Sequence, residues 1–195
     1  EMAELLRAEG VPDVRADMFG DETRRSLIDR TDVTQPALFA YQYALTAALR
    51  AAGVVPAIVL GPSLGAFAAA TAAGALTPED AARIVARRGS LVQARAGEGA
   101  MVAVMGDRAE VEDLVSALDS ATLAVVNGDS AFTIAVPVAD VETLLAAAKS
   151  RELATRRLPS TRAFHSAMME PVIDAFGATA TGGAAPTDAV FVSDT

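Results

Sequence analysis

The stretch that decides the fold runs Val54-Val55-Pro56-Ala57-Ile58-Val59-Leu60-Gly61-Pro62-Ser63-Leu64-Gly65 and leads into an alanine-rich segment. Its first seven residues are continuously apolar, which is typical of a buried strand in a parallel sheet. The pattern G-x-S-x-G follows, and a helix is expected directly after it. This order is that of a nucleophile elbow, in which a tight turn lifts a serine hydroxyl above the sheet. Because glycine and alanine are common here, the bare pattern can arise by chance, but its place between strand and helix favours a functional serine.

The elbow suggests two chemical roles. Ser63 is the candidate nucleophile, and the amide of Leu64 is placed to donate a hydrogen bond to an oxyanion. A serine nucleophile needs a base, and His165 is the only histidine in the chain. The alternative for His165 is a structural polar residue. Arg88 lies on the second helix after the elbow, but spacing alone does not distinguish it from Arg87.

The composition bounds the other function classes. The 195 residues suffice for one medium domain. A formal net charge of −9 argues against nucleic acid as a partner, because phosphate binding needs a surplus of Lys and Arg. The apolar runs fall short of the ~20 residues that cross a bilayer, so no membrane partner is expected. A single histidine and the absence of cysteine exclude multi-histidine metal sites and thiolate chemistry, so we expect no metal and a reducing, cytoplasmic setting.

Hydrophobic periodicity and capping residues predict helices on both sides of the elbow. Two short helices are expected at 1–9 and 21–29, and a longer one runs from Pro36 to a stop at Gly53. Another helix directly follows the elbow, and a last one runs from Thr77-Pro78 to near Gly97.

Beyond Gly99 the pattern changes to strand, helix, strand, strand, helix and strand, in the ranges 101–105, 109–118, 123–126, 132–136, 140–149 and 154–158. Asn127-Gly128-Asp129, between two of these strands, predicts a hairpin. The order βαββαβ is that of a ferredoxin-like unit.

We therefore expect an α/β fold in two parts. The core comprises 1–97 and 161–195, and an inserted ferredoxin-like small subdomain comprises 98–160. The chain returns to helix from Phe164, and Val190–Val192 begins a further strand. A cleft between the two parts is where a ligand is expected to bind.

Five motifs resemble those of the acyltransferase family that includes malonyl-CoA:acyl carrier protein transacylases and the acyltransferase domains of bacterial polyketide synthases. The matches run in family order over nearly the whole chain. Thr31–Ala40 resembles T-x-x-x-Q-P-A-L-F-A, Gly61–Gly65 resembles G-H-S-x-G apart from its second position, Gly99–Met101 resembles G-A-M, Asn127-Gly128 resembles the family hairpin, and Ala163–Ser166 resembles A-F-H-S.

The resemblance implies an α/β-hydrolase-like core and a catalytic dyad of Ser63 and His165. It also implies that the arginine twenty-five positions after the nucleophile, Arg88, holds the malonyl carboxylate. A guanidinium fork suits that role, because it can donate two charge-assisted hydrogen bonds to one carboxylate. The other motif residues expected at the substrate site are Gln35, Met101 and Asn127.

Substrate preference is suggested by Leu64 and Phe164. Both are similar to the residues of family members that use malonyl, whereas members that use methylmalonyl tend to carry Gln and A-S-H at these places. The ring of Phe164 is expected to crowd an α-methyl group. One misfitted methyl group is worth about 1–3 kcal/mol of discrimination.

The activity implied by the resemblance is transfer of a malonyl group from malonyl-CoA to the phosphopantetheine thiol of an acyl carrier protein. The transfer would pass through an ester on Ser63 with ping-pong kinetics, for polyketide chain extension. No tightly bound cofactor is expected, and adjacent synthase domains are expected partners. The candidates for contact with coenzyme A phosphates or an acidic carrier protein, with ordinary solvated charge as the alternative, are Arg156, Arg157 and Arg162.

The sequence departs from the family at Pro62, where the family has His, at Ala66, where Glu is common, and at Arg162, where malonyl users often have His. Two alternatives stay open: an acyl hydrolase, because the same elbow and histidine could release acyl groups to water, and a catalytically silent docking module, which Pro62 and Ala66 suggest. The family's Gly-Gln-Gly loop, which supplies the second oxyanion amide, is expected ahead of Glu1. A strand-end motif stops at Thr195, so we expect this sequence to be an excerpt.

Overall fold

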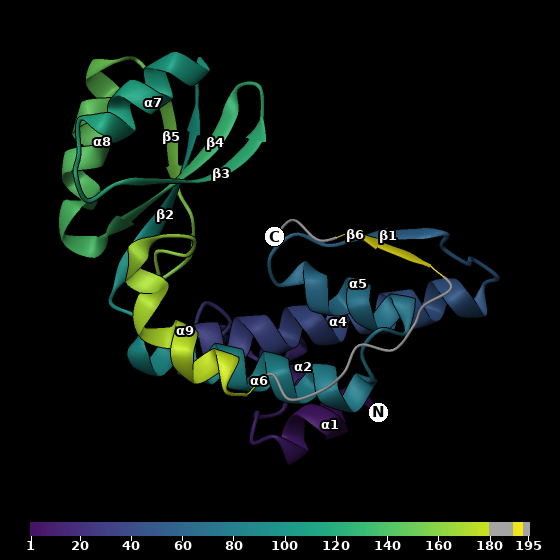
Figure 1. Ribbon diagram of the computed structural model, residues 1–195. Coiled ribbons are helices and arrows are strands. Elements are labelled where there is room, and N and C mark those ends of the chain that lie inside the picture. Colours follow the sequence, from purple (N-terminus) through teal and green to yellow (C-terminus); the bar gives the residue numbers. More distant parts are fainter. Residues whose placement is uncertain (180–188, 193–195) are drawn as a thin grey trace. The chain divides into compact units, whose positions relative to one another are not determined.

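The computed structural model describes residues 1–179 and 189–192, which form helices and strands in mixed order (Figure 1). The chain divides into two units, one made of residues 1–93 and 175–195 and the other of residues 94–174. The second unit extends beyond the expected 98–160 segment at both ends. It therefore includes His165, which lies in the part of the sequence that we expected to belong to the core.

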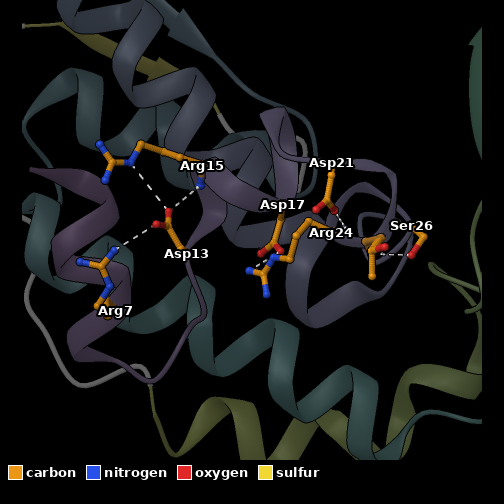
Figure 2. Close-up of polar contacts among 8 residues, drawn as sticks. Arg7, Asp13, Arg15, Asp17, Asp21, Arg24 and Ser26 are labelled. Carbon is orange, nitrogen blue, oxygen red and sulfur yellow. Dashed lines mark hydrogen bonds and ion pairs between the residues drawn. The ribbon is translucent and has the colours of Figure 1, made fainter.

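The first unit opens with short helices joined by polar contacts. Helix α2 was not expected from the sequence, and its start is capped by Asp13, whose Oδ1 accepts a hydrogen bond of 3.0 Å from the amide of Arg15 (Figure 2). Arg7 lies 3.5 Å from the other carboxylate oxygen of Asp13 and so joins the preceding helix to this cap. The three helices are α1 (Met2–Ala8), α2 (Val14–Phe19) and α3 (Glu22–Arg25).

An ion pair with a buried carboxylate connects α2 to α3. Asp17 on α2 is 1% exposed, and Nη2 of Arg24 on α3 lies 2.7 Å from its Oδ1 (Figure 2). Neither oxygen of Asp17 takes part in a well-aligned hydrogen bond within the described ranges, so the contact is an ion pair only. Because a buried charge is costly unless it is paired, Arg24 stabilises the position of α3 against α2.

Helix α4 (Thr31–Ala51) begins ahead of Pro36, so the expectation that it starts at Pro36 is wrong. The residue before a proline disfavours helical geometry. Here the first turn is supported from outside, because the amide of Thr31 donates a hydrogen bond of 3.2 Å to Oε1 of Gln93. The far end follows the expectation, with Gly53 just beyond the helix at a φ of 87°.

Strand β1 (Ile58–Leu60) is shorter than the expected Val54–Leu60. It is also not buried, since Ile58 is 64% exposed. It pairs in parallel with β6 (Val190–Val192), which confirms the strand expected there. In the described ranges the ladder joins three residues of each strand and so covers only the end of the apolar run, beyond Pro56, which has no N–H to donate.

Helices α5 (Gly65–Ala73) and α6 (Pro78–Arg95) follow as expected. Thr77 caps α6, because its Oγ1 accepts a hydrogen bond of 3.1 Å from the amide of Asp80 and donates one of 2.9 Å to the Asp80 carboxylate. The core of the first unit draws on α1, α4, α6 and the start of α5. Among its buried side chains are Leu6, Phe39, Leu64 and Val85.

The second unit is built on a four-stranded antiparallel sheet with strand order β3-β4-β2-β5. Its elements occur in the order strand, helix, strand, strand, helix, strand that the sequence predicts, and β3 and β4 form the expected hairpin. They are β2 (Gly99–Met105), α7 (Arg108–Ser116), β3 (Thr122–Gly128), β4 (Ala131–Pro137), α8 (Val141–Ser150) and β5 (Ala154–Arg157).

The two faces of this sheet have different neighbours. Helices α7 and α8 cover one face, where Val102 and Ile134 are fully buried against them (Figure 1). Side chains alternate along a strand, so Met101 and Ala135 point to the opposite face, where they pack with Ala163. The segment that carries His165 thus packs against the face that α7 and α8 leave open.

The chain beyond Phe164 is helical only from Ala167, slightly later than expected. The short helices here and after β4 are η1 (Val138–Asp140), η2 (Ala167–Met169) and α9 (Glu170–Gly177). Within residues 1–179 and 189–192, every helix is too short or too polar to traverse a lipid bilayer.

Candidate active site

Ser63 stands in a tight turn between β1 and α5. Its φ is 49°, a left-handed conformation that residues other than glycine rarely adopt. The turn is closed around it, because the amide of Gly65 donates a hydrogen bond of 2.9 Å to the carbonyl of Pro62. Pro62 therefore fits this turn, since its acceptor is used and its missing N–H is not needed for that bond.

The glycine before the serine is required by space. A Cβ atom on Gly61 would lie 2.0 Å from the carbonyl oxygen of Gly65 and 2.8 Å from the amide nitrogen of Ala66. A Cβ on Gly65 itself would meet only Cδ of Pro62, at an ordinary 3.6 Å. Of the two glycines in G-x-S-x-G, only the first leaves no room for a side chain in this turn.

The start of α5 provides a candidate oxyanion donor. The amides of Gly65, Ala66 and Phe67 donate to the carbonyls three residues earlier. The amide of Leu64 takes part in no backbone–backbone hydrogen bond in the described part of the chain. It sits directly after the serine at a helix N-terminus, where the helix dipole favours negative charge. The Leu64 side chain is buried, which fixes the turn to the core.

A pocket of about 690 Å³ opens beside the elbow, and its walls are largely apolar. Ser63 lines it together with β1, α5 and one face of α4. The α4 side chains recur every three or four residues along the helix and so mark one helix face; this spacing predicted the helix but not the pocket. Oε1 of one of them, Gln42, is buried without a hydrogen-bond partner in the described ranges. These α4 residues are Leu38, Gln42, Leu45 and Leu49.

The structure separates the two arginines that spacing could not. On α6, Arg87 is exposed, whereas Arg88 is half-buried. Burial lowers the pKa of the Arg88 guanidinium below its ordinary value, because desolvation disfavours the charged form. A partly desolvated cation interacts more strongly with an anionic ligand than a solvated one does, so Arg88 is the better candidate of the two.

Gln35 lies on α4 near the same part of α6. It is buried, and its Oε1 has no hydrogen-bond partner within the described chain. Gly89, the neighbour of Arg88, packs closely on this part of α4, since a Cβ there would lie 3.1 Å from the carbonyl of Thr31 and 3.6 Å from Cδ of Pro36. The first unit thus brings the segments of Gln35 and Arg88 into contact.

In the second unit, Met101 and Phe164 belong to one apolar cluster on the open face of the sheet. Asn127 is exposed, and its Nδ2 donates a hydrogen bond of 3.0 Å to Oγ1 of Thr133. Thr133 precedes Ala135 by two residues on β4, so its side chain lies on the same face as Met101. The sheet therefore places Met101, Asn127 and Phe164 on or beside one surface.

His165 follows Phe164 and is exposed. Its φ is 58°, so it shares with Ser63 a left-handed backbone that is rare outside glycine. Ser63 belongs to the first unit and His165 to the second, and their pairing stays a prediction.

Arg162, a candidate for coenzyme A phosphates, is only 7% exposed, and its Nη1 donates a hydrogen bond of 2.9 Å to the carbonyl of Thr161. The alternative that Arg162 is an ordinary solvated charge is therefore wrong.

No group of three residues suited to hold a metal ion occurs within 1–179 and 189–192. The candidate groups described above are a hydroxyl, an imidazole, a guanidinium and backbone amides. These groups suit the transfer of an acyl group through a serine ester.

Comparison with known sequences gives the same family that the motifs suggest. The profile described as "Acyl transferase domain" matches residues 3–191. Polyketide synthase GfsA from Streptomyces halstedii is 44% identical over 82% of this chain, and Mycoketide-CoA synthase from Mycobacterium tuberculosis is 39% identical over 87% of it. The chain spans only 2% and 4% of the length of these two relatives.

Solved structures agree. The acyltransferase domain from the second module of the salinomycin polyketide synthase matches with a TM-score of 0.84 and 37% identity, over 98% of this chain and 45% of that one. The malonyl CoA-acyl carrier protein transacylase from Burkholderia pseudomallei matches with a TM-score of 0.83 and 29% identity, over 98% of this chain and 67% of that one. The mixed α/β fold is therefore that of acyltransferase domains.

Proposed function

This chain belongs to the acyl transferase domain family, and we propose that it moves a malonyl group from malonyl-CoA to the phosphopantetheine thiol of an acyl carrier protein, by way of an ester on Ser63. The observation that carries the proposal is the elbow. Ser63 is held at a φ of 49° beside a pocket of about 690 Å³, next to an amide at a helix N-terminus.

The first half-reaction forms the ester. His165 accepts the hydroxyl proton of Ser63 while Oγ bonds to the thioester carbonyl carbon. The amide of Leu64 donates to the resulting oxyanion, and losing one such donor typically costs about 100–1000-fold in rate. The carbon–sulfur bond then breaks, and coenzyme A leaves as a thiol with the proton from His165.

The second half-reaction runs the same steps in reverse. His165 takes the proton of the phosphopantetheine thiol, the sulfur attacks the malonyl ester, and Ser63 leaves as an alcohol that regains the proton. The two half-reactions share one site, so the kinetics are ping-pong. No tightly bound cofactor takes part in either half-reaction.

Preference for malonyl is assigned to two side chains. Arg88 pairs with the free carboxylate of the malonyl group, a role supported by its partial burial on α6. Phe164 restricts the space for an α-methyl substituent, a role supported by its place in the cluster with Met101. Gln35 and Asn127 complete the proposed substrate site as hydrogen-bonding side chains.

The setting of the reaction follows from the family. We place the domain in a polyketide synthase, where it loads malonyl units for chain extension, because the relatives named above include polyketide synthases. The adjacent synthase domains and the acyl carrier protein are then its partners. The absence of cysteine supports a reducing, cytoplasmic setting.

A finer description of the fold belongs with this proposal. The second unit has the order βαββαβ and the sheet order β3-β4-β2-β5, which support a ferredoxin-like subdomain. Parallel β1 and β6, the elbow and α5 support an α/β-hydrolase-like core.

Intact mass spectrometry of the complete protein that carries this chain tests the proposal. After incubation with malonyl-CoA, one malonyl adduct is expected in the wild type and in Ser26→Ala, a surface control, and none in Ser63→Ala. Adding a carrier protein with its phosphopantetheine thiol should remove the adduct much faster than water does.

The alternatives give different results. If water removes the adduct as fast as the carrier thiol does, the domain is a hydrolase. If the wild type gains no adduct and Ser63 does not react with a fluorophosphonate probe, the domain is a catalytically silent docking module.

A further inference from the structure

The backbone of His165 needs support from its neighbours. Of the residues other than glycine in the described ranges, Ser63, Glu152 and His165 have a positive φ, and that of His165 is 58°. Such a conformation is unfavourable for a residue with a side chain and persists only where surrounding contacts hold it. An imidazole that must meet a hydroxyl at hydrogen-bond distance requires this backbone to be fixed.

The contacts come from the residue that follows. Oγ of Ser166 donates a hydrogen bond of 2.7 Å to the carbonyl of Ala163, two residues before the histidine. The same oxygen accepts a hydrogen bond of 3.3 Å from the amide of Met168. One hydroxyl therefore joins the chain on both sides of His165, and it does so as donor and as acceptor.

The far end of this bridge is anchored to the sheet. Ala163 is fully buried and packs closely on β2. A Cβ atom added to Gly99 would lie 2.6 Å from the Cβ of Ala163. The amide of Gly99 also donates a hydrogen bond of 3.1 Å to the carbonyl of Thr161. The hydroxyl of Ser166 thus transfers the rigidity of a central strand to the backbone around His165.

We propose that Ser166 is the positioning residue of the candidate base: its hydroxyl holds His165 in the left-handed conformation from which the imidazole acts on Ser63. The inference rests on the proposed function for the reaction that it serves. A second role, the capping of η2, uses only the acceptor capacity of the oxygen. The bond to Ala163 uses the donor, and it is the bond that crosses the histidine.

Three variants of Ser166 in the complete protein test this assignment. Thr keeps the hydroxyl, Cys keeps a weak donor and acceptor, and Ala removes both. Rapid-quench acylation with malonyl-CoA, read by intact mass, gives the maximal rate and the half-saturating concentration. Because a displacement of about 1 Å can cost about 100-fold in rate, Ser166→Ala should lower the maximal rate by roughly 10–100-fold.

The pattern across the variants separates positioning from folding. Ser166→Thr should stay within about 3-fold of the wild type, Ser166→Cys should fall between Thr and Ala, and half-saturation should change by less than about 3-fold in all of them. The inference is overturned if Ala matches Thr in rate, or if the loss appears only in half-saturation. If Ser166→Ala does not fold, equal rates for Thr and Cys overturn it.

A readout without catalysis keeps the two proposals apart. With ¹³C-labelled histidine, the resonances of His165, identified by their loss in His165→Asn, report its backbone conformation. They should move in Ser166→Ala and stay in Ser166→Thr. Unmoved resonances in Ser166→Ala would refute the bridge even in an active enzyme, whereas a wild type that gains no malonyl adduct refutes the proposed function alone.

Discussion

Replacing Gly61 by alanine should damage both the fold and the reaction. The added Cβ would lie 2.0 Å from the carbonyl oxygen and 2.2 Å from the carbonyl carbon of Gly65. Carbon contacts are comfortable at about 3.5–4.0 Å, so backbone atoms must move by more than about 1 Å. The nearest obstructing atoms all belong to the backbone, so a side-chain rotation cannot relieve the clash. We expect Gly61→Ala to lower the free energy of unfolding by about 3 kcal/mol, the upper end of typical overpacking costs.

The same shift should displace the proposed nucleophile. Ser63 lies two residues after Gly61 in the turn, and a displacement of about 1 Å is expected to slow its acylation by about 100-fold. The matched control is Gly65→Ala, whose Cβ would meet only Pro62, at 3.6 Å. Gly65 is the first residue of α5, where alanine is the better helix former, so the control should gain up to about 1 kcal/mol of stability.

Two measurements decide the comparison. Chemical denaturation followed by circular dichroism gives the stability difference between the variants, and intact mass after mixing with malonyl-CoA gives the rate of Ser63 acylation. A Gly61→Ala protein as stable and as fast as the wild type would refute the steric argument. If Gly65→Ala lowers the stability and the acylation rate as much as Gly61→Ala does, the space around each Cβ position does not explain the need for glycine in this motif.

The remaining predictions concern the substrate site and the ion pair between Asp17 and Arg24. Arg88→Ala should reduce the preference for malonyl over neutral acetyl by roughly 10–100-fold in competition assays, whereas Arg87→Ala should leave it unchanged; equal effects would remove Arg88 from the site. Phe164→Ser should raise the ratio of methylmalonyl to malonyl transfer by roughly 10-fold, and an unchanged ratio would contradict the crowding argument. Arg24→Met leaves buried Asp17 unpaired and should lower the free energy of unfolding by about 2 kcal/mol. This is below the ~3–5 kcal/mol of fully buried pairs, because Arg24 is 37% exposed. Arg24→Lys should retain most of the stability.

Short-range patterns in the sequence predicted much of the fold. The cap at Thr77, the stop at Gly53 and the order of strands and α-helices from β2 to β5 all depend on residues that are close together in the chain. Capping bonds and alternation of side chains act over a few residues, so they survive in any tertiary context that buries the same faces.

Where the sequence misled, the cause lay in distant contacts. Helix α4 starts at Thr31 because Oε1 of Gln93, 62 residues away, accepts from its amide. In the described ranges the apolar run before the elbow is paired only at its end, where β1 meets three residues of β6, and Val55 ahead of it is 85% exposed. Neither feature has a signal in the local pattern.

The sequence by itself determined that the chain has a serine elbow, one histidine and two neighbouring arginines, since these follow from residue identity and spacing. Only the tertiary structure decided that a Cβ at Gly61 would collide with backbone atoms, that Arg88 is less exposed than Arg87 and that Ser166 bridges the backbone around the histidine. The physical reason is that each of these depends on which atoms approach within a few ångströms or lose contact with water. Spacing along the chain does not encode such distances, because the path of the backbone and the packing of remote segments set them.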